Sequence, residues 1–167
     1  YDAVTVPAVQ TIKLEIGLRF DPVLEPEVKT VQHRFMHPFT GEPLFDAGSV
    51  KCLALKEIVA EKIRAASLRK TIAPRDFYDL GFILRNGFEL ADPQVTKLFM
   101  KKVEEDGGVA ELEKYRVNMG RAETELNDMR GRIEAELFDV LTDEERKNFD
   151  LDEALEAINK VMAKAVV

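Results

Sequence analysis

The sequence predicts an α+β protein whose strands and helices occupy separate parts of the chain. Residues 1–53 contain alternating apolar residues and many turn-forming prolines and glycines. Residues 54–167 instead carry apolar residues at helical spacing, together with helix start and stop signals. We therefore expect a β-rich part over 1–53 and a helical part over 54–167, which is the segregated arrangement of an α+β fold.

Three segments of the first part are predicted strands. Residues 11–20 (TIKLEIGLRF) alternate between apolar and polar residues, as a strand with one buried face does. Residues 28–36 are less regular, and residues 49–53 form a short third candidate. These strands predict a small antiparallel or mixed sheet. A sheet of this size exposes an edge, which favours a homodimer.

The second part predicts a bundle of helices. One helix begins at Leu55, a second at Pro74 and a third at Pro93, and residues 109–141 are helical in composition with breaks near Gly120 and Gly131. Capping boxes at Thr142 with Glu145 and at Asp150 with Glu153 mark later helix starts. The last helix has one apolar face that can dock on a bundle.

Composition excludes several classes of function. The 167 residues carry a net charge of −7, so broad electrostatic attraction to nucleic acid or an anionic membrane is not expected. No apolar run is long enough to span a membrane. The single cysteine, Cys52, excludes an internal disulfide and fits a reducing cytoplasm.

Two charged residues stand where helical spacing predicts apolar ones. Lys62 lies within the apolar stripe of the first predicted helix, and Asp76 projects from the apolar face of the second. Because an unpaired charge is costly to desolvate, this placement indicates either a functional site or an internal ion pair that locks the helices together. In a site, Lys62 would bind a phosphate or a reacting anion, and Asp76 would orient it or hold a metal.

A carboxylate on the first predicted strand is a further candidate. Glu15 shares the polar face of that strand with Lys13. Proteins usually hold Mg²⁺ with one or two carboxylates plus substrate phosphates, although a solvated strand face explains the same pattern. His33 and His37 do not predict a zinc site, because no further Cys or His joins them.

Residues 56–80, KEIVAEKIRAASLRKTIAPRDFYDL, resemble the nucleotidyltransferase AbiEii/AbiGii toxin family. Its members carry a lysine-bearing helix followed by an RDxYDL helix, here Lys62 and residues 75–80. The strand KLEI, residues 13–16, also resembles a strand of that family. The resemblance covers residues 11–85 well and the helical remainder loosely.

The resemblance implies a fold and an activity. The β-rich part would be a small sheet remnant of a polymerase-beta-like nucleotidyltransferase core, followed by a helical bundle. A nucleotide would pass from a nucleoside triphosphate (NTP), with Mg²⁺, to an acceptor, which is tRNA for some relatives. Such proteins often act as the toxin of a toxin–antitoxin or phage-defence pair, which implies a cognate antitoxin protein.

The resemblance also implies a role for each matching residue. Lys62 would contact the triphosphate, and Asp76 would orient Lys62 or the acceptor. Arg75 would help to bind the nucleotide, and Asp79 would support the same loop. On the strand, Glu15 would be a metal-binding carboxylate, and Lys13 would contact a phosphate.

One family motif has no counterpart in the sequence. A Gly-Ser turn followed by a strand with DxD should precede KLEI, whereas Gly48-Ser49 follows it and no strand DxD comes after. Because paired carboxylates hold the metals in this chemistry, and because the chain opens with Tyr1, we expect an inactive C-terminal portion of a larger enzyme. The alternative is a non-catalytic helical module that binds a partner protein.

Overall fold

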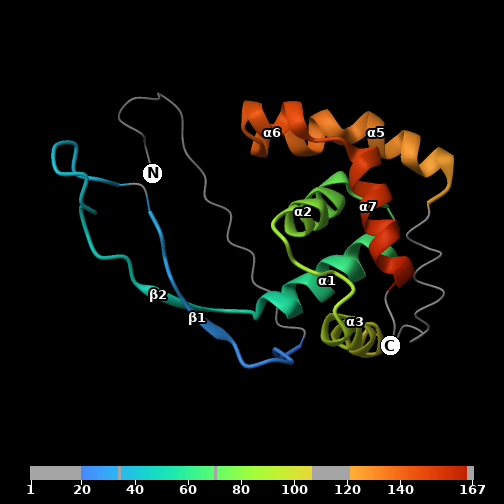
Figure 1. Cartoon of the computed structure of the whole chain (residues 1–167), viewed down its shortest axis with the longest axis horizontal. Helices are drawn as coiled ribbons and strands as arrows, with labels where there is room; N and C mark the ends of the chain where they lie inside the picture. The colour runs from blue at the N-terminus through green and yellow to red at the C-terminus, as the bar shows by residue number, and fades with distance from the viewer. Residues whose placement is uncertain (1–19, 34, 70, 107–120, 165–167) are drawn as a thin grey trace.

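The computed structural model describes residues 20–33, 35–69, 71–106 and 121–164. Within these ranges a two-stranded sheet precedes a set of packed helices (Figure 1), which confirms the predicted α+β class. The predicted strand over 11–20 lies outside the described residues except for Phe20, which is in neither helix nor strand. The division of the chain near residue 53 stays a prediction.

The two strands are antiparallel and shorter than expected. β1 (Glu27–Thr30) pairs with β2 (Ser49–Cys52). The prediction of a strand over 28–36 is wrong in its extent, because β1 ends at Thr30 and Met36 makes only an isolated bridge with Pro43. The irregular apolar pattern beyond Thr30 lacks the strict alternation that supports a longer strand.

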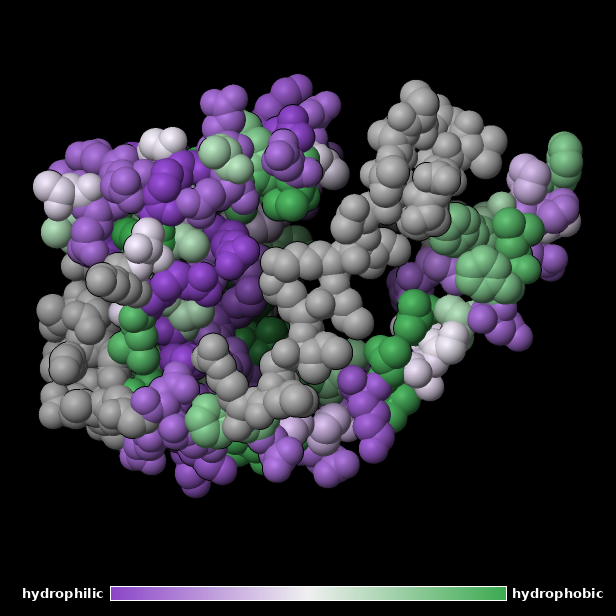
Figure 2. Space-filling view, turned by 180° about the vertical axis from the view of Figure 1, so that it is seen from behind, coloured by the Kyte–Doolittle hydropathy of each residue, from purple (hydrophilic) through white to green (hydrophobic). Residues whose placement is uncertain are grey.

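Residues 27–52, which we call the β arm, extend away from the helices (Figure 1). Apolar side chains of the arm are exposed to solvent, including 65% of Val28 and 90% of Phe39 (Figure 2). Inside the arm, the rings of His33 and Phe45 stack with their centroids 4.3 Å apart. Local ring contacts and the strand ladder therefore shape the arm, and the main core lies in the helices.

The helices begin and end close to the predicted positions. The described helices are α1 (Leu55–Leu68), α2 (Pro74–Arg85), α3 (Pro93–Glu105), α5 (Glu123–Leu137), a 3₁₀ turn η1 (Phe138–Val140), α6 (Asp143–Asn148) and α7 (Leu151–Lys164). The predicted break at Gly131 is wrong, because α5 continues through it. Gly120 lies outside the described residues.

Capping side chains explain most of these boundaries. The Asp92 carboxylate accepts hydrogen bonds from backbone amides of the first turn of α3, and Asp150 does the same for α7. Thr142 and Glu145 form a reciprocal capping box at α6. Gly87, with a φ of 83°, adopts the left-handed conformation that ends α2.

The helices share one core. α1 packs against α2 and α3, and α2 also packs against α5 and α7 (Figure 1). At the crossing of α2 and α7, a Cβ atom added to Gly81 would lie 3.3 Å from the Cβ of Ala154, so glycine permits the close approach. The largest fully buried side chains at these contacts include Phe77, Leu80, Phe99 and Ile158.

A buried ion pair joins α1 to α3. Glu57 is fully buried, and its Oε1 lies 2.8 Å from Nζ of Lys102, which is also buried. The Glu57 carboxylate further accepts hydrogen bonds from the backbone amides of Val23 and Leu24, at 2.9–3.1 Å. Lys102 also contacts Glu61 Oε1 at 2.9 Å. One carboxylate thus holds two helices and the segment that leads into β1.

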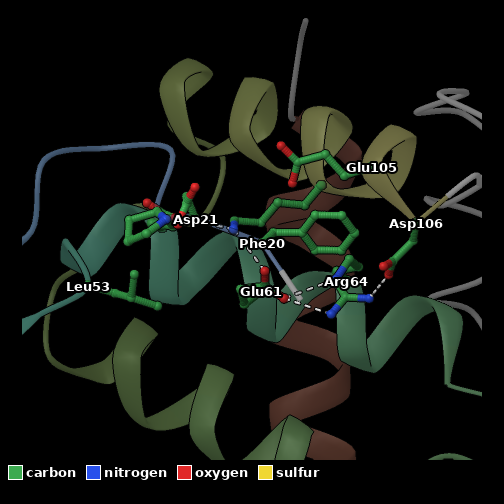
Figure 3. Close-up of a pocket in the computed structure, with 10 residues that line it drawn as sticks. Phe20, Asp21, Leu53, Glu61, Arg64, Glu105 and Asp106 are labelled. Carbon is green, nitrogen blue, oxygen red and sulfur yellow. Dashed lines mark hydrogen bonds and ion pairs between the residues drawn. The ribbon is translucent and has the colours of Figure 1, made fainter. Parts of the chain in front are cut away.

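A small cavity of about 220 Å³ lies beside this network (Figure 3). Arg64 projects along it and bonds to Glu61 and Asp106, as the dashed lines show. Phe20 and Leu53 add apolar surface. Since Glu61 is shared between Arg64 and Lys102, the basic side chains here are already neutralised, and the cavity is best explained as part of the structural network.

We expect Glu57→Gln to lower the free energy of unfolding by about 3 kcal/mol, because it removes one charge of a buried pair. Burial raises the pKa of Glu57, but the hydrogen bonds from Lys102, Val23 and Leu24 outweigh it, so the pKa is lowered. The stabilisation is therefore present above the ordinary glutamate pKa and is lost as pH falls through the lowered value.

Urea unfolding of both proteins between pH 7 and pH 3 tests this expectation. The difference in the free energy of unfolding between the wild type and Glu57→Gln should become smaller as the pH falls towards 3. The matched control is Glu156→Gln, which breaks an exposed pair with Lys160 and should change stability by less than about 0.5 kcal/mol. A pH-independent difference would contradict the assigned role of the Glu57 charge.

Candidate functional site

The first turn of α2 buries a carboxylate that has few partners. Pro74 occupies the first turn of α2, and Asp76, two residues on, is only 2% exposed. Its Oδ2 lies 3.0 Å from Nε of Arg69 without hydrogen-bond geometry, and it accepts no hydrogen bond from the described residues. Oδ2 of Asp76 is therefore a buried carboxylate oxygen with an ion contact to Arg69 but no hydrogen bond from the described residues.

The environment of Asp76 favours its neutral form. Burial raises the pKa of Asp76 and outweighs the attraction of Arg69, Lys62 and Arg75, which lowers it. Asp79 adds a smaller contribution in the raising direction. A carboxyl group with a raised pKa can hold or accept a proton closer to neutrality than an ordinary aspartate, which is a common property of functional sites.

Lys62 pairs with Asp79, which corrects the predicted pairing with Asp76. Nζ of Lys62 lies 2.5 Å from Oδ2 of Asp79, and about 35% of each side chain is exposed. Lys62 is still close enough to Asp76 to lower its pKa. The predicted lysine and aspartates therefore do gather between α1 and α2, with Asp79 as the direct partner.

The Lys62–Asp79 pair opens onto a cavity of about 660 Å³, which we call the α2 cavity. One side is polar and carries Lys62, Arg75 and Asp79. The other is apolar and is lined by Phe82, Ile83, Leu137, Val140 and Leu141. α1 and α2 thus supply Lys62, Arg75 and Asp79, and α6 adds Glu145. α2 and the chain from the end of α5 to the start of α6 supply the apolar wall. Asp76 is buried and does not line the cavity.

Tyr78 and Glu145 also line the α2 cavity. The Tyr78 hydroxyl donates a hydrogen bond to Oε1 of Glu145 at 3.0 Å. Burial and this bond raise the pKa of Tyr78, whereas bonds from Thr142 and Tyr78 lower that of Glu145. Because Glu145 also belongs to the capping box of α6, the hydroxyl is fixed in place.

The structure describes only some of the predicted site residues. Lys62, Asp79 and Arg75 line one cavity, and Arg75 has no ion-pair partner among the described residues. Lys13 and Glu15 lie outside the described residues. In the described ranges, no three His, Cys, Asp or Glu side chains are grouped so that they could hold a metal ion. The predicted role of Glu15 in binding Mg²⁺ therefore stays a prediction.

Several residues of this region had no distinct signal in the sequence. Arg69, which makes the ion contact with Asp76, is the residue that follows the last turn of α1. Tyr78 and Phe82 follow ordinary helical spacing, and Glu145 was recognised only as a capping residue. The contact between Tyr78 and Glu145 depends on how α6 packs near α2, and a local sequence pattern does not encode that packing.

These features place a cavity that is lined by both charged and apolar side chains on an α+β fold. The family model of the nucleotidyl transferase AbiEii toxins, which belong to type IV toxin–antitoxin systems, matches residues 1–164 of the chain. The chain belongs to this family, which confirms the resemblance. Neither the curated proteins nor the solved structures include a match to the chain.

We expect Asp76→Asn to raise the free energy of unfolding at pH 7 by about 1 kcal/mol, because the substitution removes a poorly compensated buried charge. The pKa of Asp76 is raised in the folded state, so the wild type loses stability as pH rises from the ordinary aspartate pKa to the raised value. Below that window both proteins should be equally stable.

Thermal and urea unfolding from pH 3 to pH 8 measure this difference. Asp139→Asn is the control, because Asp139 is an exposed residue of η1 and its substitution should leave the profile unchanged. Destabilisation by Asp76→Asn at pH 7 would show that the Asp76 charge supports the fold.

Proposed function

We propose that this chain belongs to a nucleotidyltransferase-like toxin that transfers a nucleotide from an NTP to an acceptor, with RNA such as tRNA as the acceptor class. The proposal is carried by the α2 cavity, where Lys62 and Arg75 of the family-like segment face the same space. Two cations on one wall suit a triphosphate, whose charges need fixed donors.

Each charged residue has a role in this proposal. Asp79 holds the Lys62 ammonium by one of its donors, which leaves the others for phosphate oxygens. Arg75 supplies a planar donor group with no partner among the described residues. Asp76, buried near both cations, would position them, and burial raises its pKa above the ordinary aspartate value. It acts through its neighbours, so it is a positioning residue here.

Magnesium stays a prediction. In this chemistry Mg²⁺ neutralises charge that develops on the phosphates. Its predicted carboxylate, Glu15, lies outside the described residues, among which no three His, Cys, Asp or Glu side chains are grouped. Lys62, Arg75 and Asp79 would bind and position the phosphates.

The partners follow from the same proposal. A toxin of a type IV system implies a cognate antitoxin protein, and such a pair would serve in phage defence. The exposed apolar side chains of the β arm favour a protein contact, either with that partner or in a homodimer. None of the described helices combines the length and apolar character that crossing a membrane requires.

We expect the chain to bind NTPs, and Lys62→Ala and Arg75→Ala each to weaken that binding about tenfold or more, because each removes a charge-assisted contact to phosphate. Isothermal titration calorimetry with ATP, GTP, CTP and UTP, in the presence of Mg²⁺, measures the affinities. Lys160→Ala, which removes an exposed lysine of α7, is the control and should bind as the wild type does.

The same titration separates the two functional classes. If the wild type binds no NTP, the nucleotide-binding role is wrong and the non-catalytic interaction module becomes the better explanation. If Lys62→Ala and Lys160→Ala weaken binding equally, NTP binding reflects general charge and does not use the α2 cavity.

A further inference from the structure

The apolar side of the α2 cavity exposes an aromatic ring. Phe82 is 48% exposed and Val140 is 76% exposed, although both lie next to the buried side chains of Leu137 and Leu141. A half-open apolar wall of this kind is costly in water unless a ligand covers it. The wall lies in the same cavity as Lys62 and Arg75, so one ligand can contact both sides.

The exposed ring has an aromatic neighbour. The rings of Phe82 and Tyr78 make an interplanar angle of 29°, with centroids 6.4 Å apart. Tyr78 is fixed in turn by its hydrogen bond to Glu145 and by an edge contact with Phe149 at 5.3 Å. A preformed aromatic surface loses little entropy when a second flat ring stacks on it.

We propose that the α2 cavity binds a nucleobase, stacked on Phe82, together with the phosphates held by Lys62 and Arg75. This inference rests on the proposed function and specifies which part of a nucleotide the second side of the cavity takes. The volume of about 660 Å³ is within the range of small-ligand pockets. Aromatic stacking accepts every base, because every base has a π face.

Glu145 and Tyr78, the polar groups beside Phe82, suit the hydrogen-bonding edge of a nucleobase. Glu145 accepts a hydrogen bond from Tyr78 through Oε1, and it lines the cavity beside Phe82. Its lowered pKa keeps it an anionic acceptor at neutral pH, and an exocyclic amino group is a matching donor. A base with an amino group, adenine, guanine or cytosine, should therefore bind better than uracil.

A second hollow continues beyond the same aromatic pair. It has a volume of about 440 Å³, shares Tyr78, Phe82 and Glu145 with the α2 cavity, and adds Arg85 and Asn148. The base could come from a donor NTP or from the end of an acceptor strand. A strand would extend from the α2 cavity into this hollow and bring a phosphate near Arg85, whereas an NTP would not.

The test compares Phe82→Ala and Phe82→Leu with the wild type, by calorimetry with four ligands: inorganic tripolyphosphate, ATP, UTP and a single-stranded RNA trinucleotide. Leucine keeps the apolar contact and removes the ring, so it guards against a folding defect. Phe39→Ala, a substitution of an exposed phenylalanine of the β arm, is the control. Lys62→Ala reports on the phosphates separately.

We expect both Phe82 variants to lose about tenfold in affinity for ATP, for the trinucleotide or for both, and to bind tripolyphosphate as the wild type does. A loss confined to ATP identifies the donor base. A loss confined to the trinucleotide, enhanced by Arg85→Ala, identifies the acceptor. The Phe39→Ala control should match the wild type throughout.

Two results would overturn the inference, and only one of them would also contradict the proposed function. If Phe82→Ala binds ATP and the trinucleotide as tightly as the wild type, the ring takes no base, while phosphate binding by Lys62 remains. If the wild type binds none of the four ligands, the proposed function is wrong and the base site is wrong with it.

Discussion

The structure depends on the buried pair of Glu57 and Lys102. A carboxylate and an ammonium that leave water must stay paired, so α1 and α3 can pack only where these two groups meet. Apolar side chains alone would tolerate small shifts between the helices, whereas a buried charge pair does not. Because Glu57 also binds the amides of Val23 and Leu24, the chain that enters β1 has a fixed starting point on α1. The β arm can therefore extend outward from a rigid base.

The two buried carboxylates, Glu57 and Asp76, differ in how well their oxygens are paired. Glu57 has a partner for each oxygen, and those partners lower its pKa despite complete burial. Asp76 is almost as buried, yet its Oδ2 accepts no hydrogen bond from the described residues and burial raises its pKa. A protein selected for stability alone would pair or remove such a group. The incomplete pairing of Oδ2 of Asp76 near Lys62 and Arg75 is therefore the feature from which its proposed positioning role is argued.

The sequence predicts the helices well because caps and apolar spacing are local. It also identifies Lys62 as a charge within an apolar stripe, and the same rule applies to Lys102, which lies three residues after Phe99 and seven after Val95. It assigns the wrong partner to Lys62 because Asp76 and Asp79 are three residues apart and share a helix face. Which of them reaches across depends on the crossing of α1 and α2. The apolar wall of the cavity is harder still to predict from the sequence, because residues 137–145 meet α2 only through tertiary packing.

The charge balance of the α2 cavity bears on how it binds an anion. Lys62 and Arg75 are opposed there by Asp79 and Glu145, so the formal charges on its wall cancel. The chain as a whole has a net charge of −7 and will not attract polyanions over long distances. In the proposed function, phosphate affinity would then come from short-range, oriented donors, which are weak in water unless the ligand excludes solvent. The apolar wall around Phe82 would help a bound base to exclude it. A base that covers the ring would lower the local dielectric and strengthen the contacts of the phosphates with Lys62 and Arg75.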